Sequence, residues 1–536
     1  MYEYIIVGAG SAGCLLAERL SADPGVEVLL LEAGGSDRGA DVQVPAAFSK
    51  LFKTARDWAF HTAPEPFADD RQLYVPRGKM LGGSSSMNAM IYIRGNRLDY
   101  DTWAKLGCIG WSYDDLLPHF KEIENQERGS SEFHGVGGPL NVADLREINP
   151  LSELFVEAAV ASGLPDNGDF NGASQEGFGF YQVTQKNGAR WSAADAFLRP
   201  ALRRRNLTVR TGALCERICF DGTTALGVEY SWRGKHVESY ANREVILSAG
   251  AILSPHLLML SGIGPAAELE SVGIEPVLDL PGVGANLQDH PVVPVIYHAT
   301  SPVSLDQADT FWNKARYLLR RSGPLTSNLA EAGGFVSLDG GEAPDIQFHF
   351  APAFFVDHGL VRPEGNGFSV GPTLLTPQSR GRVSLLSADP LAPPSILGNL
   401  LEDDGDIERL VEGIELAREI LERPEFDEHR SKPMQPVHGL DRAALANYVR
   451  ATVELLYHPV GTCAMGLDPM SVVDPELRVH GLDRLRVVDA SIMPLVPRGN
   501  TNAPTLAVAE KGARMILGQT VSRPTAAETE ELRASS

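Results

Sequence analysis

The sequence predicts an α/β protein that joins a doubly wound, Rossmann-like domain to a second, α+β domain built on an antiparallel sheet. Three observations lead to this prediction: a glycine-rich turn at residues 8–13 directly after a short apolar run, a second apolar run that ends in an acidic residue, and a length of 536 residues. A chain of this length exceeds one ordinary hydrophobic core, so we expect at least two domains.

The pattern of the N-terminal segment predicts a strand, a tight turn, a helix and a second strand. Apolar residues 4–7 lead into the glycine turn, a helical stretch spans 12–21, and the apolar run 26–31 ends at Glu32. Glycines let the backbone approach a pyrophosphate, the helix N-terminus faces it, and an acid about twenty positions past the last glycine binds the ribose. The segment therefore predicts a dinucleotide site formed by Gly8, Gly10, Ser11, Gly13, Glu32 and Ala33.

A second glycine-rich segment, residues 77–88, distinguishes between the possible dinucleotides. The first motif alone fits NAD or FAD. Backbone amides of this second segment could wrap another part of a large, extended cofactor, which an NAD site does not usually require. The alternative, a flexible surface loop, would expose Met80, Leu81, Met87 and Met90. The two segments together favour FAD.

The domains are expected to be interleaved along the chain, because strand-like runs recur at 207–210, 244–248 and 485–489. The segments between these runs contain turn clusters, alternating apolar residues such as 346–350, and an acidic helix over 404–421. The predicted FAD-binding domain comprises residues 1–150, 196–294 and 451–518. The predicted substrate-binding domain comprises 151–195 and 295–450, and residues 519–536 are predicted to be a disordered tail.

Charge and hydropathy exclude several classes of function. The 69 acidic residues against 47 Lys and Arg give a net charge of −22, which argues against nucleic acid or an anionic membrane as partner. We find no apolar run of about 18 residues that would span a membrane, and no signal peptide at the N-terminus. We expect a cytoplasmic protein, with peripheral membrane attachment left open.

The five cysteines are few and scattered, and Cys215 and Cys219 do not form a C-x-x-C pair. No histidine cluster accompanies them. Reduced thiols, without a disulfide framework or a metal site, are the expected state.

Several motifs make the chain resemble the glucose–methanol–choline (GMC) oxidoreductase family. The family's first signature matches residues 78–92 and its second matches 250–264. Residues 284–290 and 458–462 are also of the family's type, so the resemblance extends from residue 4 to about 515. The bacterial choline-dehydrogenase-like and alcohol-dehydrogenase-like branch is the most similar.

This resemblance implies an extended FAD bound by both glycine segments. Cys215 stands where relatives place a backbone contact to adenine. Asp489 and Ala490 stand where relatives make a second contact, to the pyrophosphate or the ribitol. Met87 stands where some relatives carry a flavin-linked histidine; methionine cannot form that bond, so we expect non-covalent FAD. The remaining cofactor residues that we predict are Trp58, Gly78, Gly82, Gly83, Ser84, Asn88, Ala89, Met90 and Pro504.

The predicted catalytic pair is His458 and Asn502. Oxidation of an alcohol removes a hydroxyl proton and a carbon-bound hydride, so the oxygen needs a base and a hydrogen-bond donor. His458 can accept the proton near neutral pH and the Asn502 amide can donate; in the resembled family these positions match the catalytic histidine and its partner. Asn502 could instead cap a helix that begins near residue 505. Of the other histidines, His290 is expected to be structural, and His349 to line the substrate pocket or pack in the core.

These residues predict an FAD-dependent oxidoreductase that converts a primary alcohol to the aldehyde, with oxygen or another electron acceptor reoxidising the flavin. A flavin-containing lyase of the hydroxynitrile lyase type, a flavin photodecarboxylase and a flavin-binding protein without turnover are the alternatives. A serine hydrolase is disfavoured because the G-x-S-x-G elbow is missing around Ser84. An apolar pocket for aromatic or medium-length alcohols is preferred to an aromatic cage for choline.

Overall fold

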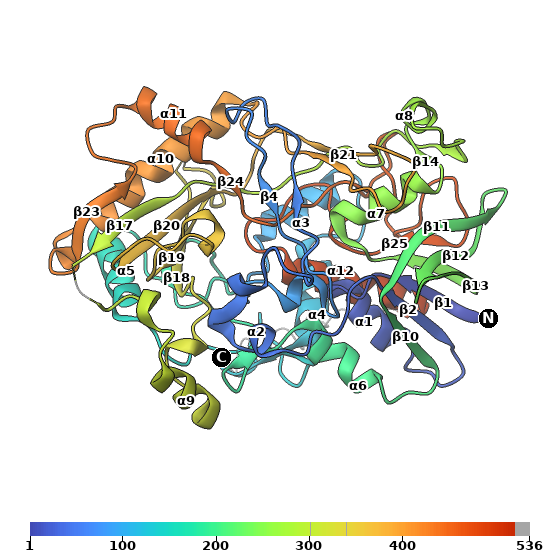
Figure 1. Cartoon of the computed structure of the whole chain (residues 1–536), viewed down its shortest axis with the longest axis horizontal. Coiled ribbons are helices and arrows are strands. Elements are labelled where there is room, and N and C mark those ends of the chain that lie inside the picture. Colours follow the sequence, from blue (N-terminus) through green and yellow to red (C-terminus); the bar gives the residue numbers. More distant parts are fainter. Residues whose placement is uncertain (301, 339, 520–536) are drawn as a thin grey trace.

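The computed structural model describes residues 1–300, 302–338 and 340–519, and Figure 1 shows their arrangement around two separate sheets. The tail predicted to be disordered lies outside the described residues, apart from Gln519. In the described ranges, no helix combines the length and the apolar character that crossing a bilayer requires.

The first sheet has seven strands and is parallel at its centre. Its strands follow the order β10-β2-β1-β13, and β25 pairs with the edge of β13 that faces away from β1. All five runs predicted as strands from the apolar pattern lie here, side by side, although they come from three distant parts of the chain. Their bounds are β1 (Tyr2–Val7), β2 (Val28–Glu32), β10 (Leu207–Thr211), β13 (Lys235–Leu247) and β25 (Leu485–Val487).

Two antiparallel strands, β11 (Ala213–Asp221) and β12 (Thr224–Trp232), extend this sheet from the long strand β13. Helix α1 (Ser11–Leu20) packs on β1 and β2, and α12 (Asn502–Ile516) packs on α1. β2 is buried along its whole length, as expected for a central strand covered on both faces. The doubly wound architecture predicted from the glycine turn is confirmed.

The second sheet has eight strands and is antiparallel, as predicted. Its main order is β23-β17-β20-β19-β18-β7, and β16 pairs with β20 and β24. The bounds are β7 (Gly177–Phe180), β16 (Pro291–Val292), β17 (Val295–Ala299), β18 (Ala332–Val336), β19 (Ile346–Ala351), β20 (Gly367–Leu374), β23 (Arg430–Gln435) and β24 (Glu454–Leu455).

Helices α5 (Pro150–Ala161) and α10 (Asp404–Leu421) cover one face of the second sheet. Side chains alternate along β19: Phe350 stacks on Phe155 of α5 at 4.6 Å between ring centroids, while His349 lies on the opposite face. That opposite face borders the cavity described below.

The position of β16 and β24 bears on the predicted domain division. Both short strands fall inside the segments assigned to the FAD-binding domain, yet both pair in the second sheet. The pairing of the second sheet therefore extends a few residues past the expected boundaries at 294 and 451. At these two places the chain passes from one sheet to the other. The division at particular residues stays a prediction.

Smaller elements complete the chain. The remaining helices are α2 (Ala40–Gln43), α3 (Arg97–Lys105), α4 (Tyr113–Ile123), α6 (Arg199–Ala201), α7 (Gly250–Leu260), α8 (Ala266–Ser271), α9 (Phe311–Arg320) and α11 (Arg442–Thr452). Paired short strands are β3 (Phe60–His61) with β4 (Tyr74–Val75), β5 (Glu124–Gln126) with β6 (Leu140–Val142), β8 (Gln185–Lys186) with β9 (Ala189–Arg190), β14 (Ile263–Gly264) with β15 (Leu278–Asp279), and β21 (Arg382–Ser384) with β22 (Ser395–Leu397).

Candidate active site

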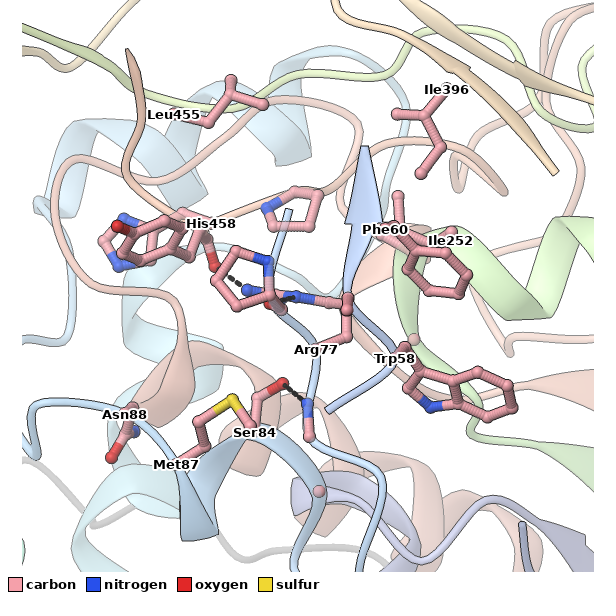
Figure 2. A pocket seen from close by; sticks show the side chains of 18 of the residues that line it. Trp58, Phe60, Arg77, Ser84, Met87, Asn88, Ile252, Ile396, Leu455 and His458 are labelled. Carbon is pink, nitrogen blue, oxygen red and sulfur yellow. Dashed lines mark hydrogen bonds between the residues drawn. The ribbon is translucent and has the colours of Figure 1, made fainter. Parts of the chain in front are cut away.

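A cavity of about 1270 Å³ is lined by residues from both sheets. Figure 2 shows His458 on one side of this pocket, Trp58 and Phe60 on another, and Met87, Ser84 and Asn88 along a third. The predicted residues that line the cavity are Gly8, Gly10, Ser11, Glu32, Ala33, Trp58, Gly78, Gly83, Ser84, Asn88, Ala89, Met90, Cys215, Asp489, Ala490, His458 and Asn502.

Three predicted cofactor residues, Gly13, Gly82 and Pro504, are not among the lining residues. Gly13 has a packing role, because a Cβ there would lie 1.8 Å from the Gly8 carbonyl oxygen. Gly82 adopts φ +84° and its amide donates to the carbonyl of Ala9 at 2.8 Å. Pro504 is buried in the first turn of α12. These three residues support the glycine turn by packing and hydrogen bonding, without lining the cavity.

The two glycine segments touch each other and leave one side of the turn open. A Cβ at Gly83 would lie 2.7 Å from Cα of Gly10. Gly8, at φ +97°, has the carbonyl oxygen of Ser248 where its Cβ would point, at 2.5 Å. Gly10 differs, because the nearest atom to a Cβ there is 3.9 Å away. The backbone at Gly10 is therefore free to approach a bound group, which fits the pyrophosphate of a dinucleotide.

Glu32 holds the glycine turn in shape. Its carboxylate oxygens accept the amides of Ala9 at 2.9 Å and Gly34 at 2.7 Å. Burial raises the pKa of Glu32 to about 7, against the lowering effect of these amides and of Lys79. Glu32 also lines the cavity, where a ribose hydroxyl could reach it. Binding of the ribose by Glu32 stays a prediction.

Asp489 has a similar role after β25. Its Oδ2 accepts the Gly250 amide at 2.8 Å and the Ser254 hydroxyl at 2.5 Å, and its Oδ1 accepts the Ser491 amide at 2.8 Å. The carboxylate thereby fixes the start of α7 against the end of the parallel strand, at the cavity wall.

The segment after the first cradle brings aromatic and thioether groups to the cavity. Trp58 stacks on Phe60 at 5.7 Å, with the Lys79 ammonium 4.2 Å from the Trp58 ring centroid. Met87 is 3% exposed and lines the cavity. The side-chain oxygen Oδ1 of Asn88 accepts a hydrogen bond from the Arg190 guanidinium at 2.8 Å, which orients the side-chain amide of Asn88.

Asn500, rather than Asn502, lies beside His458. The Nδ2 atom of Asn500 is 3.2 Å from Nε2 of His458, whereas Oδ1 of Asn502 accepts the Ser11 hydroxyl at 2.8 Å. Helix α12 begins at Asn502, which directs that side chain to the glycine turn, and Thr501 holds the N-cap position without a side-chain cap. The pairing predicted for Asn502 is therefore corrected to Asn500, and the expected helix start near 505 lies three residues too late.

The Asn500 amide is oriented by a residue of the second sheet. Nε2 of Gln347 donates to Oδ1 of Asn500 at 3.4 Å and to the Tyr181 hydroxyl at 3.1 Å. With Oδ1 occupied in this way, Nδ2 is the atom that faces His458.

Backbone and ring contacts hold His458 in place. Its amide donates to Oδ1 of Asp289 at 2.8 Å, and its Nδ1 lies 3.0 Å from Nδ1 of His290. Arg77 donates to the carbonyl of the preceding residue, Tyr457, at 2.6 Å. Tyr457 has φ +69°, a left-handed conformation that is strained for tyrosine and is kept by these neighbours.

The buried environment keeps the imidazoles neutral. Burial, reinforced by His290, His349 and Arg77, holds the pKa of His458 well below its usual value. Burial also lowers the pKa of His290 to about 3 and that of His349 to about 4. Burial has the opposite effect on a carboxylic acid and raises the pKa of Asp289 to about 7. His458 can therefore act as a base at neutral pH, with its Nε2 at the cavity.

The sequence pattern leads to Asn502 and does not single out Asn500. The structural role expected for His290 is compatible with its contact with His458 and stays a prediction. Segment 284–290, which is of the family's type, contains His290, and Asn500 lies two positions before Asn502, but neither pattern indicates the direction of a side chain.

Comparison with known proteins agrees with this geometry. The GMC oxidoreductase N- and C-terminal family models match residues 2–292 and 377–509. A Pseudomonas putida protein called alcohol dehydrogenase [acceptor] is 46% identical over 529 residues, covering 96% of each chain. A Photobacterium profundum protein called oxygen-dependent choline dehydrogenase is 44% identical over 541 residues, covering 98% of this chain and 95% of the relative.

The solved structures give the same result for the fold. Pyridoxine 4-oxidase from Mesorbium loti superposes with a TM-score of 0.90 at 33% identity, covering 97% of this chain and all of that one. A fungal aryl-alcohol oxidase superposes with a TM-score of 0.85 at 27% identity, covering 96% and 99%. The open backbone at Gly10 and the large cavity fit FAD, the cofactor of this family. The chain belongs to the GMC oxidoreductase family, as an FAD-dependent oxidoreductase that acts on CH–OH donors.

Proposed function

We propose that this protein oxidises a neutral primary alcohol to the aldehyde, with His458 as the base and Asn500 as the hydrogen-bond donor. The observation that carries the proposal is the 3.2 Å contact between these two side chains at the wall of the cavity that both glycine segments line. Bound FAD supplies the hydride acceptor.

The two side chains have complementary tasks. His458 is neutral, so its Nε2 can take the hydroxyl proton as the hydride leaves the carbon. Asn500 has two amide hydrogens on Nδ2, and one can donate to the substrate oxygen while charge develops there. Gln347 keeps the amide in this orientation through Oδ1.

The walls on the side of the second sheet favour a neutral substrate over choline. Strands β19 and β20 contribute His349, Ala351, Ser369, Val370 and Gly371 to the lining, and the adjoining loop contributes Leu329 and Ala330. None of these residues carries a carboxylate, and the Asp357 carboxylate, which the loop between β19 and β20 adds to the lining, lies 4.0 Å from Nε2 of His358.

A carboxylate elsewhere in the lining, that of Glu454, already has cationic and polar neighbours. Its Oε1 lies 3.3 Å from the Arg71 guanidinium, and its Oε2 lies 3.6 Å from Nε2 of His358 without a hydrogen bond among the described residues. Recognition of a quaternary ammonium needs a free carboxylate or an aromatic cage. An aromatic or medium-length aliphatic alcohol suits these walls better.

Met87 supports a non-covalent cofactor. Its thioether lines the cavity where a flavin-linked histidine occurs in some relatives, and it offers no atom for that bond. Acid precipitation should release all of the flavin into the supernatant. Flavin retained in the protein pellet would contradict this assignment.

An anaerobic absorbance titration of the FAD-loaded enzyme tests the proposed reaction. We expect benzyl alcohol and 1-octanol to bleach the flavin and choline to leave it oxidised. Admission of air then distinguishes an oxidase, which recolours at once, from a dehydrogenase that uses another acceptor. If dithionite reduces the flavin but no alcohol does, the redox proposal fails, and cleavage of a cyanohydrin or loss of a carboxylate under light should be measured.

A further inference from the structure

Helix α9 (Phe311–Arg320) presents large apolar side chains to solvent. Phe311 is 75% exposed, Trp312 78%, Leu318 74% and Leu319 84%. In Figure 1 the helix projects from the edge of the molecule below the second sheet. A surface helix of a globular protein normally turns such residues inward, so this cluster needs a partner.

The apolar side chains form one stripe that is directed away from the protein. At about 100° per residue, Leu318, Phe311, Leu319 and Trp312 fall within an arc of about 120°. Tyr317 lies roughly opposite this arc and is 2% exposed, and its hydroxyl donates to the carbonyl of Gln43 at 3.3 Å. The helix is therefore attached through its Tyr317 face while its apolar face is free.

Cationic side chains border the stripe. Arg316 follows Trp312 on one edge of the arc and Lys314 precedes Leu318 on the other, with Arg320 and Arg321 at the helix end. Lys314 pairs with Asp309 at 2.6 Å and Arg316 with Glu147 at 2.5 Å. Within the described part of the chain, Arg320 has no ion pair with a carboxylate. Arg321 instead donates to the Tyr317 hydroxyl at 2.8 Å and lies 4.8 Å from the Tyr317 ring centroid, on the attached face of the helix.

We propose that α9 docks this enzyme on the surface of an anionic phospholipid bilayer. Aromatic and leucine side chains on one side of a helix, bordered by Lys and Arg, insert at the boundary between headgroups and acyl chains and attract anionic lipid. The overall charge of −22 argues against an anionic membrane, although the sequence leaves peripheral attachment open. Salt screens charges beyond about 8 Å, however, so the local cations of α9 decide the contact.

The helix also adjoins the wall of the active-site cavity. Asp309, just before α9, pairs with Lys50 at 3.1 Å in the 3-10 helix Pro45–Leu51. That 3-10 helix contributes Phe48 to the cavity lining, and Phe52 follows it there. Docking through α9 would bring this wall close to the bilayer, where apolar alcohols concentrate.

Vesicle co-sedimentation of the FAD-loaded enzyme tests the proposal. The vesicles are phosphatidylcholine alone, or phosphatidylcholine with about one third phosphatidylglycerol. We expect the wild type to sediment with the anionic vesicles and to be partly released by salt. The double substitution Trp312→Ser with Leu319→Ser should lower the partition coefficient at least about tenfold. The substitution Arg320→Gln should lower the preference for anionic lipid.

The matched control is Ile109→Ser with Leu467→Ser, which removes apolar side chains of comparable exposure, 76% and 62%, from another surface. It should bind vesicles as the wild type does, and alcohol turnover in detergent-free buffer should be unchanged in all three variants. Equal binding of the α9 variant and the wild type would overturn the proposal. So would a wild-type dimer in size-exclusion chromatography that the α9 substitutions dissociate, because a second copy would then cover the stripe.

Discussion

The seven-stranded sheet and the eight-stranded sheet both border the cavity, yet they contribute different kinds of atoms to it. Next to the first sheet, the cavity is lined by the backbone of Gly8 and Gly10, which follow β1. The nearby carboxylates of Glu32 and Asp489 accept hydrogen bonds from backbone amides. At the second sheet the cavity meets side chains that project from strands, such as His349 and Val370. Close backbone approach suits phosphates and sugars, whereas shaped side chains suit an alcohol.

This difference affects how each side tolerates substitution. A cradle of backbone atoms is blocked by any added side chain, while a wall of side chains can change volume at smaller cost. The proposed catalytic pair lies between the two regions, since His458 is held by Asp289 and Arg77, and Asn500 by Gln347 of the second sheet.

The largest effect is expected from Gly10→Val. The protein itself leaves room for this side chain, with the nearest atom 3.9 Å from the Cβ, so the fold should survive while the valine occupies the space of the pyrophosphate. Purified protein should be colourless, with FAD affinity reduced beyond detection by fluorescence titration. Gly168→Val is the matched control, because nothing lies within 4 Å of a Cβ there. A yellow Gly10→Val enzyme would refute the cradle assignment.

His458→Ala should lower the rate of flavin reduction by alcohol roughly 10²–10⁴-fold, the usual contribution of a general base. The variant should remain yellow, because His458 belongs to the reacting wall and not to the backbone cradle. Anaerobic stopped-flow absorbance measures the rate. Loss of FAD instead of rate would show that His458 maintains the structure.

The corrected pairing of the asparagines predicts unequal effects at two neighbouring positions. Asn500→Ala should lower the reduction rate about 10²-fold, as expected for loss of one donor to a developing charge. Asn502→Ala loses only the Ser11 contact and should weaken FAD binding with a rate loss below about tenfold. The reverse order would restore the assignment made from sequence. Stopped-flow rates and FAD titrations of both variants decide between them.

The smallest effect concerns pH. A lowered pKa means that His458 keeps its basic, unprotonated form to lower pH than a free histidine, whose pKa is 6.5. Activity is lost only as pH falls through the lowered value, so kcat/KM should stay level through pH 6.5 and decline below it. A decline centred near 6.5 or above would show that His458 is not desolvated. Rates from about pH 5 to 8 give this profile.

Features that depend on local geometry could be predicted from the sequence. The glycine turn, the buried strand that ends at Glu32 and the helix over 404–421 follow from backbone preferences and apolar periodicity within short windows. The prediction of His458 as the base came instead from the family-type motif at 458–462. The family resemblance then indicated FAD, and the family comparisons confirmed it.

The directions of individual side chains depend on packing between distant segments and could not be predicted from the sequence. Asn500 and Asn502 differ by two positions, and which of them meets His458 depends on where α12 starts and on Gln347, which lies more than 150 residues away. The contact of His290 with His458, the pairing of β16 with β24, and the outward stripe of α9 are likewise set by packing between distant segments. A sequence pattern records periodicity along one segment, but the neighbour on each face is fixed by burial across the whole fold.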